Sequence, residues 1–167
     1  MMVKEMLALL GREIARLNET IAALDKKLAA LHQASAMSRL LGEIPGFGRI
    51  TALTATLTVD PGQFKSGRHL AAWIGLTPKE RSTGGKRRLG AISKQGNERL
   101  RQLLVLGATA VIKVAKPGHR YATPWLLKLL ERRPRRVAAV ALANKMARIL
   151  WAMMTSGEAY RQPPVAA

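Results

Sequence analysis

The chain of 167 residues contains no cysteine and only three histidines. Without thiols it can form no disulfide and no thiolate metal site, and it has no thiol nucleophile. His32, His69 and His119 are far apart in the sequence and lack the spacing of metal ligands. We therefore interpret them as ordinary surface or core imidazoles, and we expect no metal ion or other cofactor to bind to this chain itself.

Uninterrupted apolar segments are also missing. Residues 1–17 carry charges from Lys4 onward, unlike a signal peptide. The most apolar run, Val137–Met154, contains Lys145 and Arg148, and we expect it not to span a bilayer. No segment alternates clearly enough to predict a sheet strand. The sequence therefore predicts a soluble, cytoplasmic, all-α protein with one domain's worth of chain and no membrane partner.

Acidic residues are few: 10 Asp and Glu face 28 Lys and Arg, which gives a formal net charge of +18. A field of this size attracts polyanions, of which nucleic acid is the commonest. Ribosomal RNA or an anionic membrane surface would satisfy the same electrostatics.

The densest cationic segment is Lys79–Arg101, with eight Lys and Arg against two Glu. Its two adjacent glycines permit positive φ and a close approach of backbone N–H groups to a bulky anion. Ser82 places a hydroxyl among donors suited to phosphate, although an ordinary turn serine would look the same. The predicted DNA contacts of this segment are Arg81, Gly84, Gly85, Lys86, Arg87, Arg88, Lys94 and Arg101.

An apolar heptad seam predicts one long helix over residues 3–34, within an oligomerising segment 1–38. The seam ends at Ser35 and Ser38, where the pattern requires apolar residues. A narrow seam favours a partner helix in a homodimer or higher oligomer, and the alternative is an amphipathic helix packed on its own domain. Positions a are Leu7, Ile14, Ile21 and Leu28, and positions d are Leu10, Leu17, Leu24 and Leu31.

Residues 40–57 match a helix-hairpin-helix pattern. Ile44 and Phe47 are expected to plug the turn into the core, and the glycines around Phe47 to adopt positive φ. The first amides of the helix that follows would then face a DNA phosphate. A tight turn without a ligand is the alternative. The predicted DNA contacts here are Gly46, Gly48 and Arg49.

The compact helical domain is expected to cover residues 39–161, followed by a frayed tail, 162–167. Pro78 to Ser93 is interpreted as a loop or small hairpin. Arg132–Arg136 forms a second basic patch, either solvated or in contact with phosphate. Further helices are predicted after an N-cap at Ser66 and over residues 97–114, 124–131 and 135–154, the last as the central core helix.

Several linked motifs occur in a fixed order between Leu40 and Arg161. The main ones are Ile44-Pro45-Gly46-Phe47-Gly48, Ala71-Ala72-Trp73-Ile74-Gly75-Leu76-Thr77-Pro78, Ser82-Thr83-Gly84-Gly85-Lys86, Gly96-Asn97 and Ala141–Arg148. In these motifs the chain resembles the C-terminal domain of the DEDD-type insertion-sequence transposases, which are bridge-RNA-guided serine recombinases.

The resemblance implies a particular chemistry. Members of that family carry an RNase H-like domain whose four carboxylates hold Mg²⁺, then a coiled coil, then the domain resembled here. Ser82 would attack a DNA phosphodiester and form a phosphoserine intermediate, with Ser93 as the fallback nucleophile. Lys86, Arg87 and Arg88 would stabilise the charge that develops on phosphorus. The implied partners are DNA, a guide RNA and the RNase H-like domain, within the nucleoid of a bacterial cytoplasm.

The chain departs from that family in one large respect, because it has no acidic tetrad. Asp25 and Asp60 are its only aspartates. We therefore expect a truncated product or an excised C-terminal portion that binds DNA but cannot cut it alone, with Mg²⁺ needed only by the missing domain. Two alternatives stay open: a non-catalytic helix-hairpin-helix nucleic-acid-binding module, and a basic structural protein on RNA.

Overall fold

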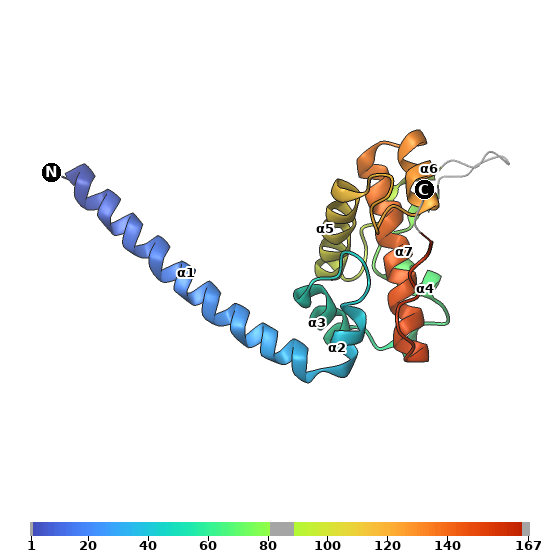
Figure 1. Ribbon diagram of the computed structural model, residues 1–167, viewed down its shortest axis with the longest axis horizontal. Coiled ribbons are helices and arrows are strands. Elements are labelled where there is room, and N and C mark those ends of the chain that lie inside the picture. The colour runs from blue at the N-terminus through green and yellow to red at the C-terminus, as the bar shows by residue number, and fades with distance from the viewer. Residues whose placement is uncertain (1, 81–88, 165–167) are drawn as a thin grey trace.

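A long helix projects from a compact helical domain in the computed structural model, which describes residues 2–80 and 89–164 (Figure 1). The remaining residues lie outside the described part of the chain. Seven of the predicted site residues fall among them: Arg81, Ser82, Gly84, Gly85, Lys86, Arg87 and Arg88.

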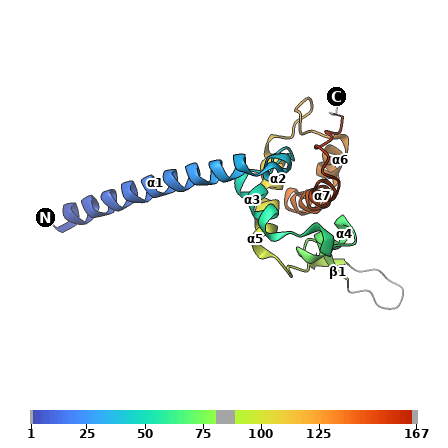
Figure 2. The same cartoon turned by 90° about the horizontal axis from the view of Figure 1, so that it is seen from below.

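The projecting helix is α1, Met2–Ala34, and it contains no buried residue. Its contacts with the domain are with α2 (Ala36–Leu41) and α3 (Arg49–Thr58), near its C-terminal end (Figures 1 and 2). Seam positions such as Leu10 and Ile21 are 55% and 57% exposed. The single long helix is thus confirmed, and it does not fold back on its own domain. Its pairing with another chain stays a prediction.

The end of the seam becomes a corner between α1 and α2. The Ser35 hydroxyl caps α2 by accepting a hydrogen bond from the Ser38 amide. Ser38 is fully buried, and its hydroxyl lies 2.7 Å from Nδ1 of His32. The serines that interrupt the apolar pattern therefore stop one helix and start the next.

The turn between α2 and α3 is anchored as predicted. Ile44 and Phe47 are 1% and 7% exposed. Gly46 adopts a φ of +86°, and a Cβ there would lie 2.7 Å from the Gly107 carbonyl oxygen. The prediction of positive φ was wrong for Gly48, whose φ is −84° because it caps α3 in an extended conformation.

The core is organised around α7, Arg135–Ser156. Helices α5 (Glu98–Val114), α4 (Gly67–Trp73), α6 (Pro124–Arg132) and α2 pack against it, as does the short 3₁₀ turn η1 (Pro61–Gln63). Figure 2 views α7 nearly along its axis, with α5 on one side and α4 on another. The central role predicted for this helix is confirmed. Its length and hydropathy would also suit a membrane span, and 39% of the apolar window is buried within the domain.

Local capping explains where the remaining helices begin. The side chains of Ser66, Asn97 and Thr123 accept hydrogen bonds from backbone amides in the first turns of α4, α5 and α6. Pro124 follows Thr123 at the first helical position, where its missing N–H costs nothing.

Two short antiparallel strands, β1 (Pro78–Glu80) and β2 (Leu89–Ile92), form a small hairpin within the otherwise helical fold. Pro78 pairs with Ile92 and Glu80 with Leu89. Of the two interpretations of this segment, the hairpin is the correct one. The all-α class still describes the fold, because no larger sheet occurs in the described residues.

The chain end is tied to the domain for several residues after α7. The Tyr160 amide donates to a carboxylate oxygen of Glu43 at 3.0 Å, and the Gln162 side chain donates to the Arg120 carbonyl at 2.7 Å. The predicted frayed tail therefore begins with an anchored residue.

Candidate nucleic-acid interface

The base of the hairpin is joined to the end of α4 by backbone hydrogen bonds. The Ser93 amide donates to Thr77 at 2.8 Å, and the Lys94 amide donates to Gly75 at 3.2 Å. Gly96 has a φ of +73°, and a Cβ there would overlap the Trp73 carbonyl oxygen. Only glycine allows the two backbone segments to approach this closely.

Arg101 completes this anchor from α5. It is only 8% exposed, and one guanidinium nitrogen donates to the carbonyls of Ile74 and Gln95, each at 3.0 Å. Arg101 was predicted to contact DNA, but its buried guanidinium binds backbone oxygens of the protein itself. We therefore assign it a structural role: it holds the hairpin base against α4 and α5.

Lys94 has the one positive φ among the non-glycine residues of the described chain, at 57°. A left-handed conformation costs a side-chain-bearing residue roughly 1–2 kcal/mol. Such strain is often found at functional sites, where the surrounding structure enforces it. Here it is enforced by the anchored backbone on both sides, and the exposed Lys94 side chain lines the groove described next.

A groove with a cavity volume of about 1520 Å³ runs along one face of α7, between that helix, the start of α4, the hairpin and α6. We call it the α7 groove. Its wall is largely apolar, with Leu76, Ile92, Val140 and Ile149 among the lining residues. The lining residues include no Asp or Glu, and five of them are cations: Arg68, Lys94, Arg136, Lys145 and Arg148.

Two of these cations stand out by their surroundings. The Lys145 ammonium lies 4.4 Å from the ring centroid of Trp125, over its face. Burial lowers the pKa of Lys145, and the positive charge of Arg148 lowers it further. A cation kept partly desolvated beside another cation is typical of a site whose ligand supplies the missing negative charge.

A side-chain hydrogen bond also holds two walls of the groove together. The Asn144 side chain, on α7, donates to the Leu76 carbonyl at 3.2 Å. Leu76 lies two residues before β1 and is 2% exposed. This bond connects the groove wall on α7 to the hairpin, in addition to the Arg101 anchor.

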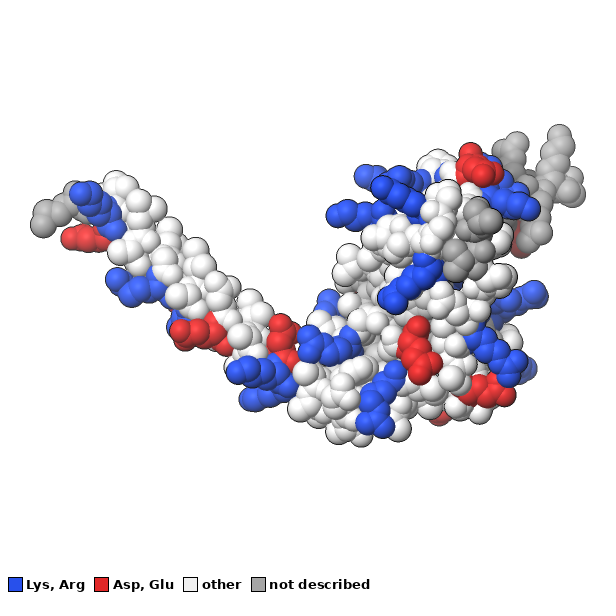
Figure 3. Space-filling model, viewed as in Figure 1, with Lys and Arg blue, Asp and Glu red and all other residues white. Residues whose placement is uncertain are grey.

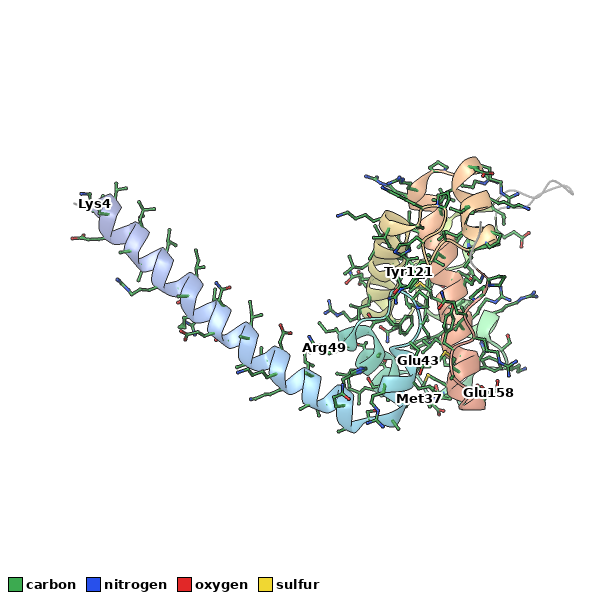
Figure 4. The ribbon with its side chains drawn as sticks, viewed as in Figure 1. Lys4, Met37, Glu43, Arg49, Tyr121 and Glu158 are labelled. Carbon is green, nitrogen blue, oxygen red and sulfur yellow. The ribbon has the colours of Figure 1, made fainter. Side chains whose placement is uncertain are left out.

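The predicted contacts at the start of α3 form a separate surface. Gly48, Arg49 and Ile50 are exposed, and no side chain caps this helix, so its first amides have no side-chain acceptor. Figure 4 shows Arg49 on the part of the domain that adjoins α1. No residue of α2 or α3 lines the α7 groove. Of the described site predictions, only Lys94 lies in the groove.

The second basic patch meets the groove at one end. Arg132, Arg133 and Arg135 are exposed, and Arg136 lines the groove. On the face shown in Figure 3, Lys and Arg side chains spread over the compact domain and gather at its end away from the α1 junction. The patch and the groove thus offer a continuous path for an anionic chain.

Sequence reasoning missed most of the groove. Lys145 and Arg148 were noted as interruptions of an apolar run and as part of the Ala141–Arg148 motif, but not as ligand contacts, and Trp125 was not singled out. A signal was present, because two cations three residues apart lie on the same face of a helix. Their apolar setting marks them as groove residues rather than a solvated face.

A cationic groove beside an anchored hairpin, on a helical domain, is typical of proteins that handle nucleic acid. Comparison with known proteins narrows this class. Residues 38–123 match the sequence profile described as "Transposase IS116/IS110/IS902 family". The chain belongs to this transposase family.

Named relatives agree with that assignment. The chain is 52% identical to a putative transposase of Sinorhizobium fredii, over 96% of its own length and 42% of the relative's. It is 43% identical to a probable family 20 transposase of Pseudomonas aeruginosa, over 95% and 45% of the two chains. It is 41% identical to the transposase for insertion sequence element IS1111A of Coxiella burnetii, over 95% and 44%. The chain thus spans less than half the length of each of these relatives.

Proposed function

We propose that this chain is the DNA-binding and nucleophile-bearing C-terminal portion of an insertion-sequence transposase that exchanges DNA strands. The observation that carries the proposal is the α7 groove, a cationic surface free of acidic lining residues at the base of a hairpin. The residues that join the two strands, 81–88, contain Ser82 and four of the predicted phosphate-binding cations. The groove would thus lead a DNA backbone toward the serine.

In the proposed reaction, the Ser82 hydroxyl oxygen bonds to a DNA phosphorus and the bond from that phosphorus to a DNA oxygen breaks. The serine gives up its hydroxyl proton, the released DNA oxygen takes up a proton to become a hydroxyl, and the protein is left joined to DNA through a phosphoserine. A serine hydroxyl is a weak nucleophile until a base or a metal activates it. Lys86, Arg87 and Arg88 are proposed to stabilise the charge on phosphorus.

Activation is proposed to come from another domain. No group of three or more His, Asp and Glu that could hold a metal ion occurs in the described residues. The family resemblance implies an RNase H-like domain, in the same polypeptide or in trans, whose carboxylates would hold Mg²⁺. The chain alone is therefore expected to bind DNA without cutting it, and a guide RNA would direct the assembled protein.

Joining this chain to the N-terminal part of a full-length relative tests the proposal. With a matching guide RNA and target, the fusion should form a covalent protein–DNA adduct, detected as a band shift in a denaturing gel. Ser82→Ala should abolish the adduct and leave DNA binding within about twofold, because one hydroxyl adds little affinity.

Ser93→Ala is the matched control, since Ser93 is also a serine near the hairpin and its backbone amide, which the substitution keeps, holds the hairpin base. An adduct that survives Ser82→Ala but is lost in Ser93→Ala would assign the nucleophile to Ser93 instead. Cleavage by the isolated chain would refute the composite site.

A second candidate is a non-catalytic helix-hairpin-helix module. The exposed and uncapped start of α3 favours it, because those amides could bind a backbone phosphate. Under this hypothesis, Arg49→Ala should reduce the slope of log K for duplex binding against log salt concentration by about one unit, while Lys94→Ala should leave that slope unchanged. The reverse result favours the groove.

The exposed apolar seam of α1 supports a proposed homodimer or higher oligomer. An apolar stripe this long on a projecting helix is unusual for a monomer. Figure 3 shows the uncharged surface that follows this helix. A monomer at micromolar concentration in analytical ultracentrifugation would contradict this part of the proposal.

A further inference from the structure

We propose that the α7 groove binds an unpaired DNA strand, with Trp125 as a platform on which a base stacks and Lys145 as the cation for the adjoining phosphate. The inference rests on the proposed DNA-binding function and specifies its substrate: a single strand rather than intact duplex.

The first argument is the pairing of an aromatic ring with a cation. Trp125 is 38% exposed, and its indole lines the groove. Lys145 Nζ is 4.4 Å from the ring centroid. The part of the indole that Lys145 leaves exposed offers a stacking surface to a base, and the ammonium over the ring offers a partner to the phosphate of that nucleotide. The two side chains together therefore match the two parts of one nucleotide.

The second argument is the apolar wall. Duplex DNA presents sugars and phosphates on its outside, and its base faces are covered by neighbouring pairs. A duplex would therefore set charged backbone against apolar side chains such as Val140 and Ile149. An unpaired strand can turn base faces to this wall and its phosphates to the cations at the rim, as single-strand-binding grooves do.

The third argument is length and charge. Arg136, Lys145 and Arg148 lie along α7, and the first and last of them are separated by roughly 18 Å of helix. This spacing suits a short run of nucleotides in a single-strand site. Because no acidic residue lines the groove, its charge complements a phosphate backbone along the whole path.

DNA is favoured over RNA by continuity with the hairpin. Pro78 and Ile92, at the base of the hairpin, both line the groove. The strand that occupies the groove would lie at the base of the same hairpin whose connecting residues carry the proposed DNA nucleophile, Ser82. The strand that is bound would then be the strand that reacts.

Fluorescence anisotropy with the full chain tests the proposal. Four labelled probes with about twelve nucleotides per strand are compared: oligothymidine, an abasic oligomer with the same phosphates, a duplex and oligouridine. We expect oligothymidine to bind more tightly than the abasic oligomer. Trp125→Ala should weaken oligothymidine binding about tenfold or more and leave abasic and duplex binding within about twofold. Trp125→Phe should retain most of the affinity.

Trp73→Ala is the matched control, because Trp73 is equally exposed, at 39%, and does not line the groove. It should show no selective loss. Lys145→Met provides a second test that does not remove the ring: it should weaken binding of both oligothymidine and the abasic oligomer. Thermal unfolding of each variant confirms that it is folded.

The proposal is overturned if oligothymidine binds no better than the abasic oligomer, or if Trp125→Ala affects all probes equally. Tighter, Trp125-dependent binding of oligouridine would assign the groove to RNA and overturn the DNA assignment. If salt-dependent duplex binding persists in either case, the proposed DNA-binding function stands while this inference falls. A chain that binds none of the probes would refute both.

Discussion

The start of α3 and the α7 groove both present positive charge, but they are built in different ways. The α3 surface comes from one continuous segment, in which Ile44 and Phe47 fix the turn and Gly48 and Arg49 follow directly. The groove combines residues from Ser66 to Ala152, drawn from two helices, a hairpin and part of a third helix. One surface is local in sequence, and the other exists only once the domain has folded.

This difference predicts how each surface responds to change. The α3 surface needs little beyond its own turn, so its exposed residues should tolerate substitution. The groove depends on residues that do not line it, above all Gly96 and the buried Arg101, which join the hairpin base to α4 and α5. Substitutions in the two regions can therefore test the comparison directly.

The largest difference is expected for the same substitution at two glycines. Gly96→Ala should destabilise the domain by about 3 kcal/mol or more, because φ is +73° and the new Cβ would overlap the Trp73 carbonyl. Gly48→Ala should cost less than about 1.5 kcal/mol, since its φ is −84° and nothing lies within 4 Å of a Cβ there. Urea denaturation measures both. Similar losses would mean that the groove region is no more constrained than the turn.

Next in size is a comparison of two arginines that were both predicted to contact DNA. Arg101→Met should lower the free energy of unfolding by about 2–3 kcal/mol, because it leaves the carbonyls of Ile74 and Gln95 without their charged donor. Arg49→Met, on the exposed start of α3, should change it by less than about 0.5 kcal/mol. An Arg101 variant of normal stability would return this residue to the list of DNA contacts.

The same contrast explains how much could be predicted from the sequence. Helix positions were predicted closely because their signals are local: the Asn97 side chain caps the amide three residues later, and the apolar spacing of α1 and α5 has the helical period. The buried turn residues Ile44 and Phe47 were also predicted correctly, for the same reason.

The groove was not predicted, because its contacts are distant in sequence. Lys145 lies over Trp125 and Asn144 bonds to Leu76, and no periodicity links such pairs. The anchoring role of Arg101 was not predicted, because a sequence displays charge and conceals burial. The shape of α1 was predicted, whereas its pairing remains open because it depends on a second chain.

A smaller effect is expected at Lys94, where the groove has strain that the α3 surface lacks. Lys94→Gly should raise the free energy of unfolding by up to about 1 kcal/mol, because glycine adopts a φ of 57° without the side-chain clash. The same variant should lower the slope of log K for DNA binding against log salt concentration by about one unit if the ammonium contacts a phosphate. Lys79→Gly, at an exposed position in β1, is the control for general loss of charge. A Lys94 variant with lower stability would show that no strain is stored there.

The smallest effect concerns the pH dependence of stability. Burial and the charge of Arg148 lower the pKa of Lys145 in the folded protein, so the unfolded chain holds this proton to a higher pH. Stability should therefore rise slightly with pH across the window between the lowered folded pKa and the ordinary unfolded pKa. Lys145→Met should remove that rise and leave stability near neutral pH unchanged or higher, while DNA binding weakens. Urea unfolding of the Lys145→Met variant and of the unsubstituted protein, at a series of alkaline pH values, measures this difference. A Lys145→Met variant that loses stability at neutral pH would show that the cation mainly holds Trp125 in place, and that its charge serves the fold rather than a ligand.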